Sequence, residues 1–283
     1  MTPNATKPNE RANFYETALH YWTTQPSENP ELLGVPAVGG GGPIEVLYRQ
    51  YEELRHFRRI VPIDKSKLLL ELGCGNGRWA IALAPLLNYY EGVDFSAQMI
   101  AIARSRAEKH GLKNVGFFEA AAQAYGPVHS FDVIYLSGVT QFIEDGELIT
   151  LVSELRRYLK PGGVIVERST VKINGREEVL ARTSDQYTSI YRTAQELSSL
   201  FYTAGFHKSY QRESYAYFNF PPKVNAFFNR RKIVKMIRGT APLSFIILRL
   251  LALMSRKTLG PLGEMRDYAH VFMRFRRSSD TYV

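Results

Sequence analysis

The sequence has little of what a secreted, metal-dependent or membrane-spanning protein needs. Its only cysteine, Cys74, excludes an intramolecular disulfide framework and suits a reducing compartment. Residues 1–13 are polar and lack the apolar core of a signal peptide, and no apolar run reaches the ~18 residues that a membrane-spanning helix needs. The cysteine and the six histidines show no metal-ligand spacing, so no metal site is predicted. The expected location is therefore the cytoplasm.

Acidic residues are scarce at the end of the chain. Residues 207–283 contain 15 Lys and Arg against 4 Asp and Glu, whereas residues 1–206 contain 21 against 23. The net charge of +9 is therefore concentrated in this last part of the sequence. A basic surface attracts phosphates, whether they belong to nucleic acid, anionic lipid or a phosphorylated substrate.

One stretch, residues 67–96, organises the rest of the chain. An apolar run at Leu68–Leu70 ends in Glu71, three glycines follow at alternate positions, and a helical pattern leads to a second apolar run that ends on Asp94. The glycines are Gly73, Gly75 and Gly77. This pattern predicts a strand, a glycine turn, a helix and a second strand. Glycine lets a ligand approach the backbone closely, and an acid at the end of the second strand can accept both hydroxyls of a ribose, so the stretch indicates a nucleoside site.

The spacing of the glycines argues against a dinucleotide site. Such a site reads Gly-x-Gly-x-x-Gly and receives a pyrophosphate, whereas this loop reads Gly-x-Gly-x-Gly and follows an acid, Glu71, which suits a cationic amino-acid tail. Further motifs are Phe95, Ser96 and Met99 after Asp94, and the Lys-Pro-Gly-Gly turn at residues 160–163. With these motifs in order, the chain resembles the class I S-adenosylmethionine-dependent methyltransferases from about residue 60 to residue 205. An ordinary α/β loop and a nicotinamide site are the alternatives.

The resemblance implies an α/β fold, a seven-stranded, mostly parallel, Rossmann-like sheet with helices on both faces. A helical pattern at Phe14–Trp22 precedes this domain, and the resemblance implies that it forms an N-terminal helical cap over the cofactor and substrate. The sequence also adds a helical insertion between the last two strands. The implied cofactor is S-adenosyl-L-methionine, with S-adenosyl-L-homocysteine as the product. The expected domains are an N-terminal lead and cap at residues 1–60, a methyltransferase domain at residues 61–220 and 268–283, and the insertion at residues 221–267.

The resemblance also implies which residues hold the cofactor. The family often has an acid after the third strand that binds the adenine amino group, but alanines follow Glu119 here, so a backbone N–H or the Gln123 side chain would replace it. Tyr15, on the expected N-terminal helix, would face the site. The full expected set is Glu71, Gly73, Cys74, Gly75, Gly77, Asp94, Phe95, Met99, Ala121, Ala122, Gln123, Ser137 and Tyr15.

Methyl transfer from a sulfonium is an in-line displacement, so the enzyme mainly aligns the acceptor with the methyl carbon. A hydroxyl acceptor also needs a base within hydrogen-bond reach. Glu167, at the end of the expected fifth strand, is the first candidate for a base or a substrate-orienting acid, and a salt bridge to Arg168 or Arg192 is its alternative role. His20 and Tyr21 of the N-terminal cap are the second candidates.

A long insertion separates the last two strands, which are expected at His207–Phe220 and Tyr268–Arg276 as an antiparallel pair. About 47 residues lie between them, far more than the usual loop, and they should lie over the active site because they follow the carboxyl end of a strand parallel to the first five. Two helical patterns, Lys223–Arg238 and Leu243–Met254, mix basic with apolar residues, and neither is long enough to cross a bilayer. Residues 223–257 therefore have three interpretations: a helical lid, a contact with a membrane surface, or a dimer face. The protein is accordingly expected to be a monomer or a homodimer.

The favoured function is methyl transfer from S-adenosylmethionine to a small or medium-sized acceptor. Oxygen is favoured over nitrogen because the Asn-Pro-Pro-Tyr type of motif, typical of amide and base-amino methylation, is missing after the fourth strand. The basic, partly apolar insertion favours an anionic, sugar, natural-product or lipid-linked acceptor. The second hypothesis is an RNA methyltransferase that binds phosphates with the basic C-terminal quarter. The sequence shows no separate RNA-binding module, so nucleic acid is not the favoured acceptor. The third is a non-catalytic, cofactor-binding partner of another protein.

Overall fold

The computed structural model of the chain describes residues 43–173, 175, 178–182, 187–213, 230–239, 243, 244, 246, 247, 250 and 268–278. The chain divides into two compact units, and each is described by itself. The first contains the described residues within 63–212 and 268–278, and the second contains those within 43–62 and 213–250. The expected N-terminal cap lies outside the described residues, apart from the helix that ends at residue 60.

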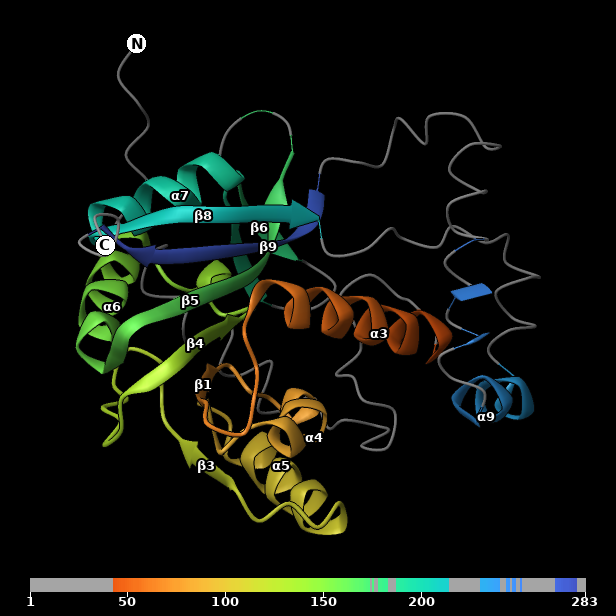
Figure 1. The fold of residues 1–283 in the computed structure, drawn as a ribbon. Coiled ribbons are helices and arrows are strands. Elements are labelled where there is room, and N and C mark those ends of the chain that lie inside the picture. Colours follow the sequence, from red (N-terminus) through yellow and green to blue (C-terminus); the bar gives the residue numbers. More distant parts are fainter. Residues whose placement is uncertain are drawn as a thin grey trace. The chain divides into compact units, whose positions relative to one another are not determined.

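A seven-stranded sheet forms the centre of the first unit (Figure 1). The strand order is β3-β2-β1-β4-β5-β9-β8; β1 to β5 are parallel, and β9 is antiparallel to β5. The strands are β1 (Leu68–Leu72), β2 (Tyr89–Asp94), β3 (Val115–Glu119), β4 (Phe131–Ser137), β5 (Leu159–Lys172), β8 (Phe206–Glu213) and β9 (Tyr268–Arg277). The central strands β1 and β4 are apolar almost throughout, because both faces of a parallel sheet are covered.

The edge strand β8 runs in the same direction as β1 to β5. The Ser278 N–H donates a hydrogen bond to the Gly205 carbonyl at 3.0 Å, and the Ser209 hydroxyl donates to the Arg274 carbonyl at 3.1 Å. Residue numbers therefore rise along β8 while they fall along β9, so these two strands are antiparallel. The expected seven-stranded, mostly parallel fold, with its last two strands paired antiparallel at one edge of the sheet, is confirmed.

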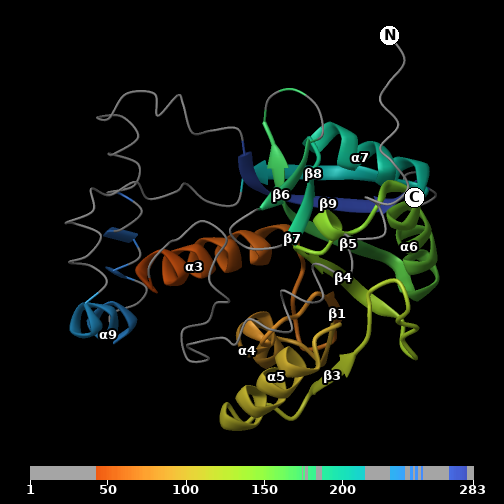
Figure 2. The same ribbon diagram turned by 180° about the vertical axis from the view of Figure 1, so that it is seen from behind.

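Helices cover both faces of this sheet (Figures 1 and 2). On one face lie α4 (Arg78–Leu83) and α5 (Ala97–Lys109), and on the other lie α6 (Asp145–Tyr158) and α7 (Ala194–Thr203). On the α4 face the Trp79 ring meets Tyr135 edge-on, with 5.2 Å between ring centroids. On the α7 face Phe201 stacks on Phe275 of β9 at 4.0 Å. These buried rings pack the helices of both layers against the sheet.

β5 is longer than the sequence pattern predicts. The apolar run predicts a strand that ends at Glu167, but β5 continues to Lys172 because its extension pairs with β9. An antiparallel hairpin of β6 (Glu178–Arg182) and β7 (Tyr187–Tyr191), which the pattern does not predict, follows it. The Lys172 N–H donates to the Arg192 carbonyl at 2.9 Å and so links the end of β5 to the residue that follows the hairpin. The prediction that Glu167 ends its strand is therefore wrong, since the side chain lies inside β5.

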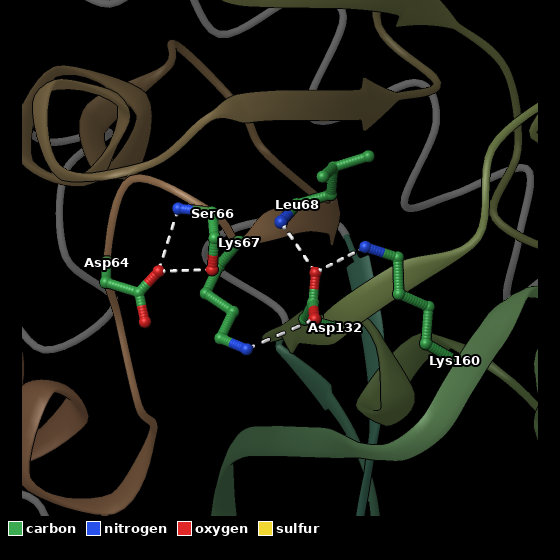
Figure 3. Close-up of polar contacts among 6 residues, drawn as sticks. All are labelled: Asp64, Ser66, Lys67, Leu68, Asp132 and Lys160. Carbon is green, nitrogen blue, oxygen red and sulfur yellow. Dashed lines mark hydrogen bonds and ion pairs between the residues drawn. The ribbon is translucent and has the colours of Figure 1, made fainter.

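Asp132 ties three strands together at the amino end of the sheet (Figure 3). Its Oδ2 accepts hydrogen bonds from the Leu68 N–H at 2.9 Å and from the Lys160 ammonium at 2.8 Å. The ammonium of Lys67 lies 3.5 Å from its other oxygen. Burial acts to raise the pKa of Asp132, but the hydrogen bonds from Lys160 and Leu68 outweigh it and the pKa is lowered. The lysine of the Lys-Pro-Gly-Gly turn thus has a structural role in joining β5 to β1 and β4.

We expect Asp132→Ala to lower the free energy of unfolding by about 2–3 kcal/mol, because hydrogen bonds to a charged group are worth about 1.5–3 kcal/mol and a backbone N–H loses its partner. Asp132→Asn, the matched control, keeps an acceptor for that N–H and should lose less. Because folding lowers this pKa, the contribution is present at neutral pH and is lost as the pH falls below the unfolded value of about 3.9. Urea denaturation of both variants measures the effect; equal stability of Asp132→Ala and the wild type would contradict it.

The second unit contains helices from two separate parts of the chain. The helical pattern predicts Pro43–Ile60, and α3 has these bounds. Within the predicted helix Lys223–Arg238, the described part is α9 (Arg231–Gly239), and the described residues between 243 and 250 are also helical. No helix in the described part of the chain is long and apolar enough to cross a membrane. The prediction that the insertion lies over the active site stays a prediction.

Candidate cofactor and acceptor site

The glycine turn after β1 is bonded to the end of β2. The N–H groups of Gly73 and Cys74 donate to the Val93 carbonyl at 2.8 Å and 3.0 Å. The φ angles of Gly73, Gly75 and Gly77 are 80°, 50° and 73°, values that residues with a Cβ rarely adopt. The three alternate glycines therefore form a tight loop between the carboxyl ends of two parallel strands.

Asp94, the last residue of β2, anchors this loop. Its Oδ2 accepts a hydrogen bond from the Gly75 N–H at 2.9 Å, and its Oδ1 accepts one from the Ser96 N–H at 3.0 Å. Burial raises the pKa of Asp94, and these two N–H groups act against that rise. Each carboxylate oxygen has two lone pairs, so each can accept one further hydrogen bond, such as one from a ribose hydroxyl. A Cβ added to Gly75 would meet no atom of the described chain within 4 Å, so these residues fit a nucleoside at this loop.

The other loop residues pack against the protein. A Cβ on Gly73 would overlap the Val139 side chain, and one on Gly77 would lie 3.0 Å from the Ala103 Cβ of α5. Cys74 is buried, and burial raises the pKa of its thiol, so its small size explains its position better than reactivity does. Gly73, Cys74 and Gly77 therefore shape the loop, and their contact with a cofactor stays a prediction.

Glu71 is buried in β1 next to the loop and accepts a hydrogen bond from the Tyr90 hydroxyl of β2. Burial raises the pKa of Glu71 to about 8, although the hydrogen bonds from Tyr90 and Ser137 and the charge of Arg78 act in the opposite direction. At neutral pH the carboxyl is therefore mostly protonated. A cation placed beside it would stabilise the carboxylate, which is what the amino-acid tail of the implied cofactor would supply.

The loop after β3 begins beside Asp94. The Ala120 N–H donates to the Asp94 carbonyl at 3.0 Å. Ala121 and Ala122 are half-buried, whereas the Gln123 side chain is exposed and its amide donates to Glu147 of α6 at 3.4 Å. The geometry thus favours the backbone of this loop over the Gln123 amide as a contact for an adenine ring.

The remaining predicted residues fall into two groups. Phe95 and Ser137 are half-buried at the ends of β2 and β4, and Met99 is buried in α5. The three predicted residues of the N-terminal cap lie outside the described residues, and their roles stay predictions; they are Tyr15, His20 and Tyr21.

Gly138 and Arg168 meet where β4 ends. The Gly138 N–H donates to the Arg168 carbonyl at 2.9 Å, and Ser137 is paired with Arg168 in the sheet. A Cβ built on Gly138 would lie 3.7 Å from Arg168 Nη1, so the guanidinium reaches the loop that follows β4. Arg168 is only 7% exposed. A largely buried cation therefore lies at the carboxyl edge of the sheet, the edge at which parallel α/β folds bind their ligands.

Glu167 is buried in β5, next to Arg168 in the sequence. Its Oε1 accepts hydrogen bonds from the Thr140 hydroxyl at 2.8 Å and from the Ser169 hydroxyl. Its Oε2 has no hydrogen-bond partner in the described part of the chain. Burial raises the pKa of Glu167 to about 7, while the two hydroxyls and the charges of Arg168 and Arg192 act to lower it. This carboxyl can therefore exchange a proton near neutral pH.

Arg192 fixes the turn that carries Thr140, a short 3-10 helix, η2 (Thr140–Phe142). Its guanidinium donates to the Thr140 and Ile143 carbonyls, both at 2.8 Å, and pairs with Asp145 at 2.6 Å. Arg192 therefore positions the Thr140 hydroxyl that binds Glu167. Because the strand before Arg192 is not predicted from the sequence, no pattern indicated this role.

Comparisons with known proteins agree with this geometry. Residues 69–163 match a family model described as a methyltransferase domain. The chain is 27% identical over 175 residues to the demethylmenaquinone methyltransferase of Geobacillus stearothermophilus, a match that covers 52% of this chain and 74% of that protein. It is 34% identical over 113 residues to the trans-aconitate 2-methyltransferase of Azoarcus sp. (strain BH72), covering 37% of this chain and 40% of that protein. In fold it resembles a solved DhpI–SAH complex, with a TM-score of 0.58, 18% identity, and 94% of this chain and 98% of that chain covered.

We expect Asp94→Ala to weaken binding of the cofactor by about 1.5–3 kcal/mol, because two hydroxyls lose a charged acceptor. The matched control is Asp64→Ala, which removes an exposed aspartate that accepts hydrogen bonds from Ser66 in the turn before β1. Calorimetric titration gives both dissociation constants. If Asp94→Ala and the wild type bind equally well, the ribose role of Asp94 is wrong.

Proposed function

The chain is a class I S-adenosylmethionine-dependent methyltransferase, and we propose that it transfers the methyl group to an oxygen of a small anionic acceptor. The cofactor, when bound, supplies a methyl group activated by a sulfonium. The protein supplies alignment, complementary charge and, for a hydroxyl acceptor, a group that takes the proton. The observation that carries the proposal is the guanidinium of Arg168, inside β5, beside Gly138, which directly follows β4.

The residues at the ends of β1 and β2 would hold the cofactor. Asp94 would accept the ribose hydroxyls, the Gly75 backbone would lie against the ligand, and Glu71 would face the cationic amino-acid tail. The free lone pairs of Asp94, the open space beside Gly75 and the buried carboxyl of Glu71 support these roles. The methyl group would then point toward the end of β4 and the part of β5 that pairs with it.

Arg168 would bind the anionic group of the acceptor. A guanidinium can pair with a carboxylate or a phosphate through two parallel hydrogen bonds, which fixes the acceptor's orientation. Away from bulk water such a pair is stronger than on an exposed surface. The names of the relatives point to different acceptors, since one names trans-aconitate, an anion, and another demethylmenaquinone. The guanidinium of Arg168, and not those names, therefore indicates an anionic acceptor.

Glu167 supports oxygen as the methylated atom. Its pKa of about 7 suits a group that accepts a proton from a hydroxyl near neutral pH. The proton would pass to the carboxyl directly or through the Thr140 hydroxyl that donates to it. The Ser-Gly-Val sequence at the end of β4, in place of an Asn-Pro-Pro-Tyr type of motif, also favours oxygen over an amide nitrogen.

Transfer of a labelled methyl group from S-adenosylmethionine into a cell extract tests the proposal. The extract is separated into protein, RNA, neutral and anionic small-molecule fractions before the reaction. We expect the label in the anionic small molecules, as a methyl ether or, if alkali releases it, as a methyl ester. Label confined to protein or RNA would overturn the proposal while leaving the methyltransferase assignment intact.

The charge of Arg168 gives a sharper test once an acceptor fraction is found. We expect Arg168→Met to raise KM for the acceptor by about 10- to 100-fold, because a charge-assisted pair worth about 1.5–3 kcal/mol is lost. Arg168→Lys keeps the charge but loses the paired N–H donors of the guanidinium, so its KM should lie between those of the wild type and Arg168→Met. The dissociation constant of S-adenosylmethionine should stay the same in both variants. An unchanged KM in Arg168→Met would show that the acceptor does not use this cation.

A further inference from the structure

The insertion before β9 carries an exposed apolar stripe at helical spacing. Leu243, Ile246, Ile247 and Leu250 are helical and follow the i, i+3, i+4, i+7 pattern that places side chains on one face. Their exposed fractions are 63%, 48%, 51% and 56%. In a helix on the surface of a globular protein, such a stripe normally faces the core. Met236 of α9 is likewise 56% exposed, so large apolar side chains gather at the surface of this segment.

The same segment is strongly basic. Nine Lys and Arg lie between residues 223 and 257, and no acidic residue occurs between residues 214 and 263. Among the described residues of this segment, Arg230, Lys232 and Lys235 are exposed. The surface therefore combines positive charge that local acids do not neutralise with aliphatic side chains that the described protein does not cover.

We propose that residues 230–239 together with Leu243, Ser244, Ile246, Ile247 and Leu250, the basic–apolar segment, form a docking surface for an anionic lipid bilayer. An anionic bilayer accounts for both the charge and the apolar stripe, because its headgroups attract Lys and Arg while Leu and Ile enter the boundary of the acyl chains. The segment would lie in the plane of the interface, since no helix of the described chain is long and apolar enough to cross a membrane. This inference does not depend on which acceptor is methylated.

The charge and the apolar stripe together favour lipid over other occupants. RNA would neutralise the basic residues but would leave four aliphatic side chains in water, whereas single-stranded nucleic acid is usually held by aromatic stacking as well as charge. A second copy of the chain could cover the stripe but would bring two copies of this basic segment together, and their like charges repel. Each of these alternatives gives a different result in the experiment below.

The first experiment sediments the full chain with two kinds of vesicle, phosphatidylcholine alone and phosphatidylcholine with phosphatidylserine. We expect binding to the anionic vesicles only, and weaker binding as the salt concentration rises, because counter-ions screen the attraction. Failure to sediment with the anionic vesicles at low salt would overturn the proposal.

Matched variants test whether the apolar stripe itself, and not just any exposed apolar side chain, is needed for vesicle binding. Ile246→Ser combined with Ile247→Ser should weaken partition into anionic vesicles at least about tenfold, because two apolar side chains no longer enter the bilayer. Val128→Ser, which changes an 89% exposed aliphatic outside the segment, should have no effect. Unchanged partition of the double variant would overturn the proposal. Retained S-adenosylmethionine binding by every variant shows that each is folded.

The basic residues are tested in the same way. Lys232→Gln with Lys235→Gln should weaken vesicle binding and reduce its dependence on salt, whereas Lys65→Gln with Lys113→Gln, at exposed positions elsewhere, should not. Size-exclusion chromatography and RNA titration of the wild type complete the test. A dimer that the double isoleucine variant dissociates, or tight RNA binding without vesicle binding, would assign the surface to those partners and overturn the proposal.

Discussion

Gly75→Val should lower the affinity for S-adenosylmethionine by about 100-fold or more, because the new side chain fills ligand space and forces a β-branched residue into a positive φ. At Gly75 the φ is 50°, and the position of the missing Cβ is open in the described chain. The Gly75 N–H also donates to Asp94, so a shifted backbone would disturb the carboxylate that is expected to hold the ribose. Calorimetric titration measures the loss of affinity.

Gly111→Val is the matched control for this substitution. Gly111 also has a positive φ, 66°, and open space where a Cβ would stand, but it follows α5, away from the glycine loop. Both variants should therefore lose some stability through backbone strain, and only Gly75→Val should lose the cofactor. Retained affinity in Gly75→Val, or an equal loss in Gly111→Val, would contradict the placement of the cofactor at this loop.

Binding of S-adenosylmethionine should release close to one proton at about pH 7, and its affinity should fall about tenfold for each pH unit below that. The source of the proton is Glu71, whose pKa in the free protein is about 8 because of burial. The cationic tail of the cofactor would stabilise the carboxylate and so lower this pKa in the complex. At lower pH the protonated carboxyl must be ionised against a rising proton concentration, which is why affinity falls.

The groups that face Glu71 set the limits of this effect. Tyr90, Ser137 and Arg78 stabilise the carboxylate, and Asp94 opposes it. The amino group of the cofactor itself loses its charge above a pH of about 8, so affinity should pass through a maximum near that value. Tyr90→Phe removes a donor to the carboxylate and should move the acid limb of the profile to higher pH, a shift that a purely structural role of Tyr90 would not cause.

Titration in buffers of different ionisation enthalpy counts the released protons. Glu71→Gln should release almost none and should bind with little dependence on pH between about 5 and 7. Glu167→Gln removes another buried carboxyl, whose pKa burial raises to about 7, and should leave the count unchanged. Proton release that persists in Glu71→Gln would show that another group ionises on binding.

The periodicity of the sequence predicted most of the fold because the strands are short apolar runs and the helices are amphipathic. The helix α3 has the predicted bounds, and the glycine turn and Asp94 lie where the strand–turn–helix pattern puts them. These features depend on neighbours in the sequence. Local patterns therefore suffice for them.

The extension of β5 and the β6–β7 hairpin were missed because their residues alternate or are charged, and tertiary pairing decides their conformation. The residues after Glu167 pair with β9, which is about 100 residues away in the sequence. Glu167 consequently lies inside a strand and binds Thr140 and Ser169, whereas the apolar run placed it at a strand end.

The functional site likewise has features that the local sequence predicts and features that depend on tertiary contacts. Glu71 and Asp94 can be chosen from the sequence, but their environments cannot. The Tyr90 hydroxyl that reaches Glu71 comes from β2, and the Arg192 guanidinium that holds the Thr140 turn comes from the residue after β7. The raised pKa of Glu71 and that of Glu167 follow from burial, which a sequence pattern does not give residue by residue.

A single pair of calorimetric titrations, with S-adenosylmethionine and with a nicotinamide dinucleotide, tests the central claim most directly. The site described here predicts saturable binding of one S-adenosylmethionine per chain in the micromolar range and no binding of the dinucleotide. Absence of S-adenosylmethionine binding, or a preference for the dinucleotide, would contradict the assignment of the glycine loop, Glu71 and Asp94 as its site.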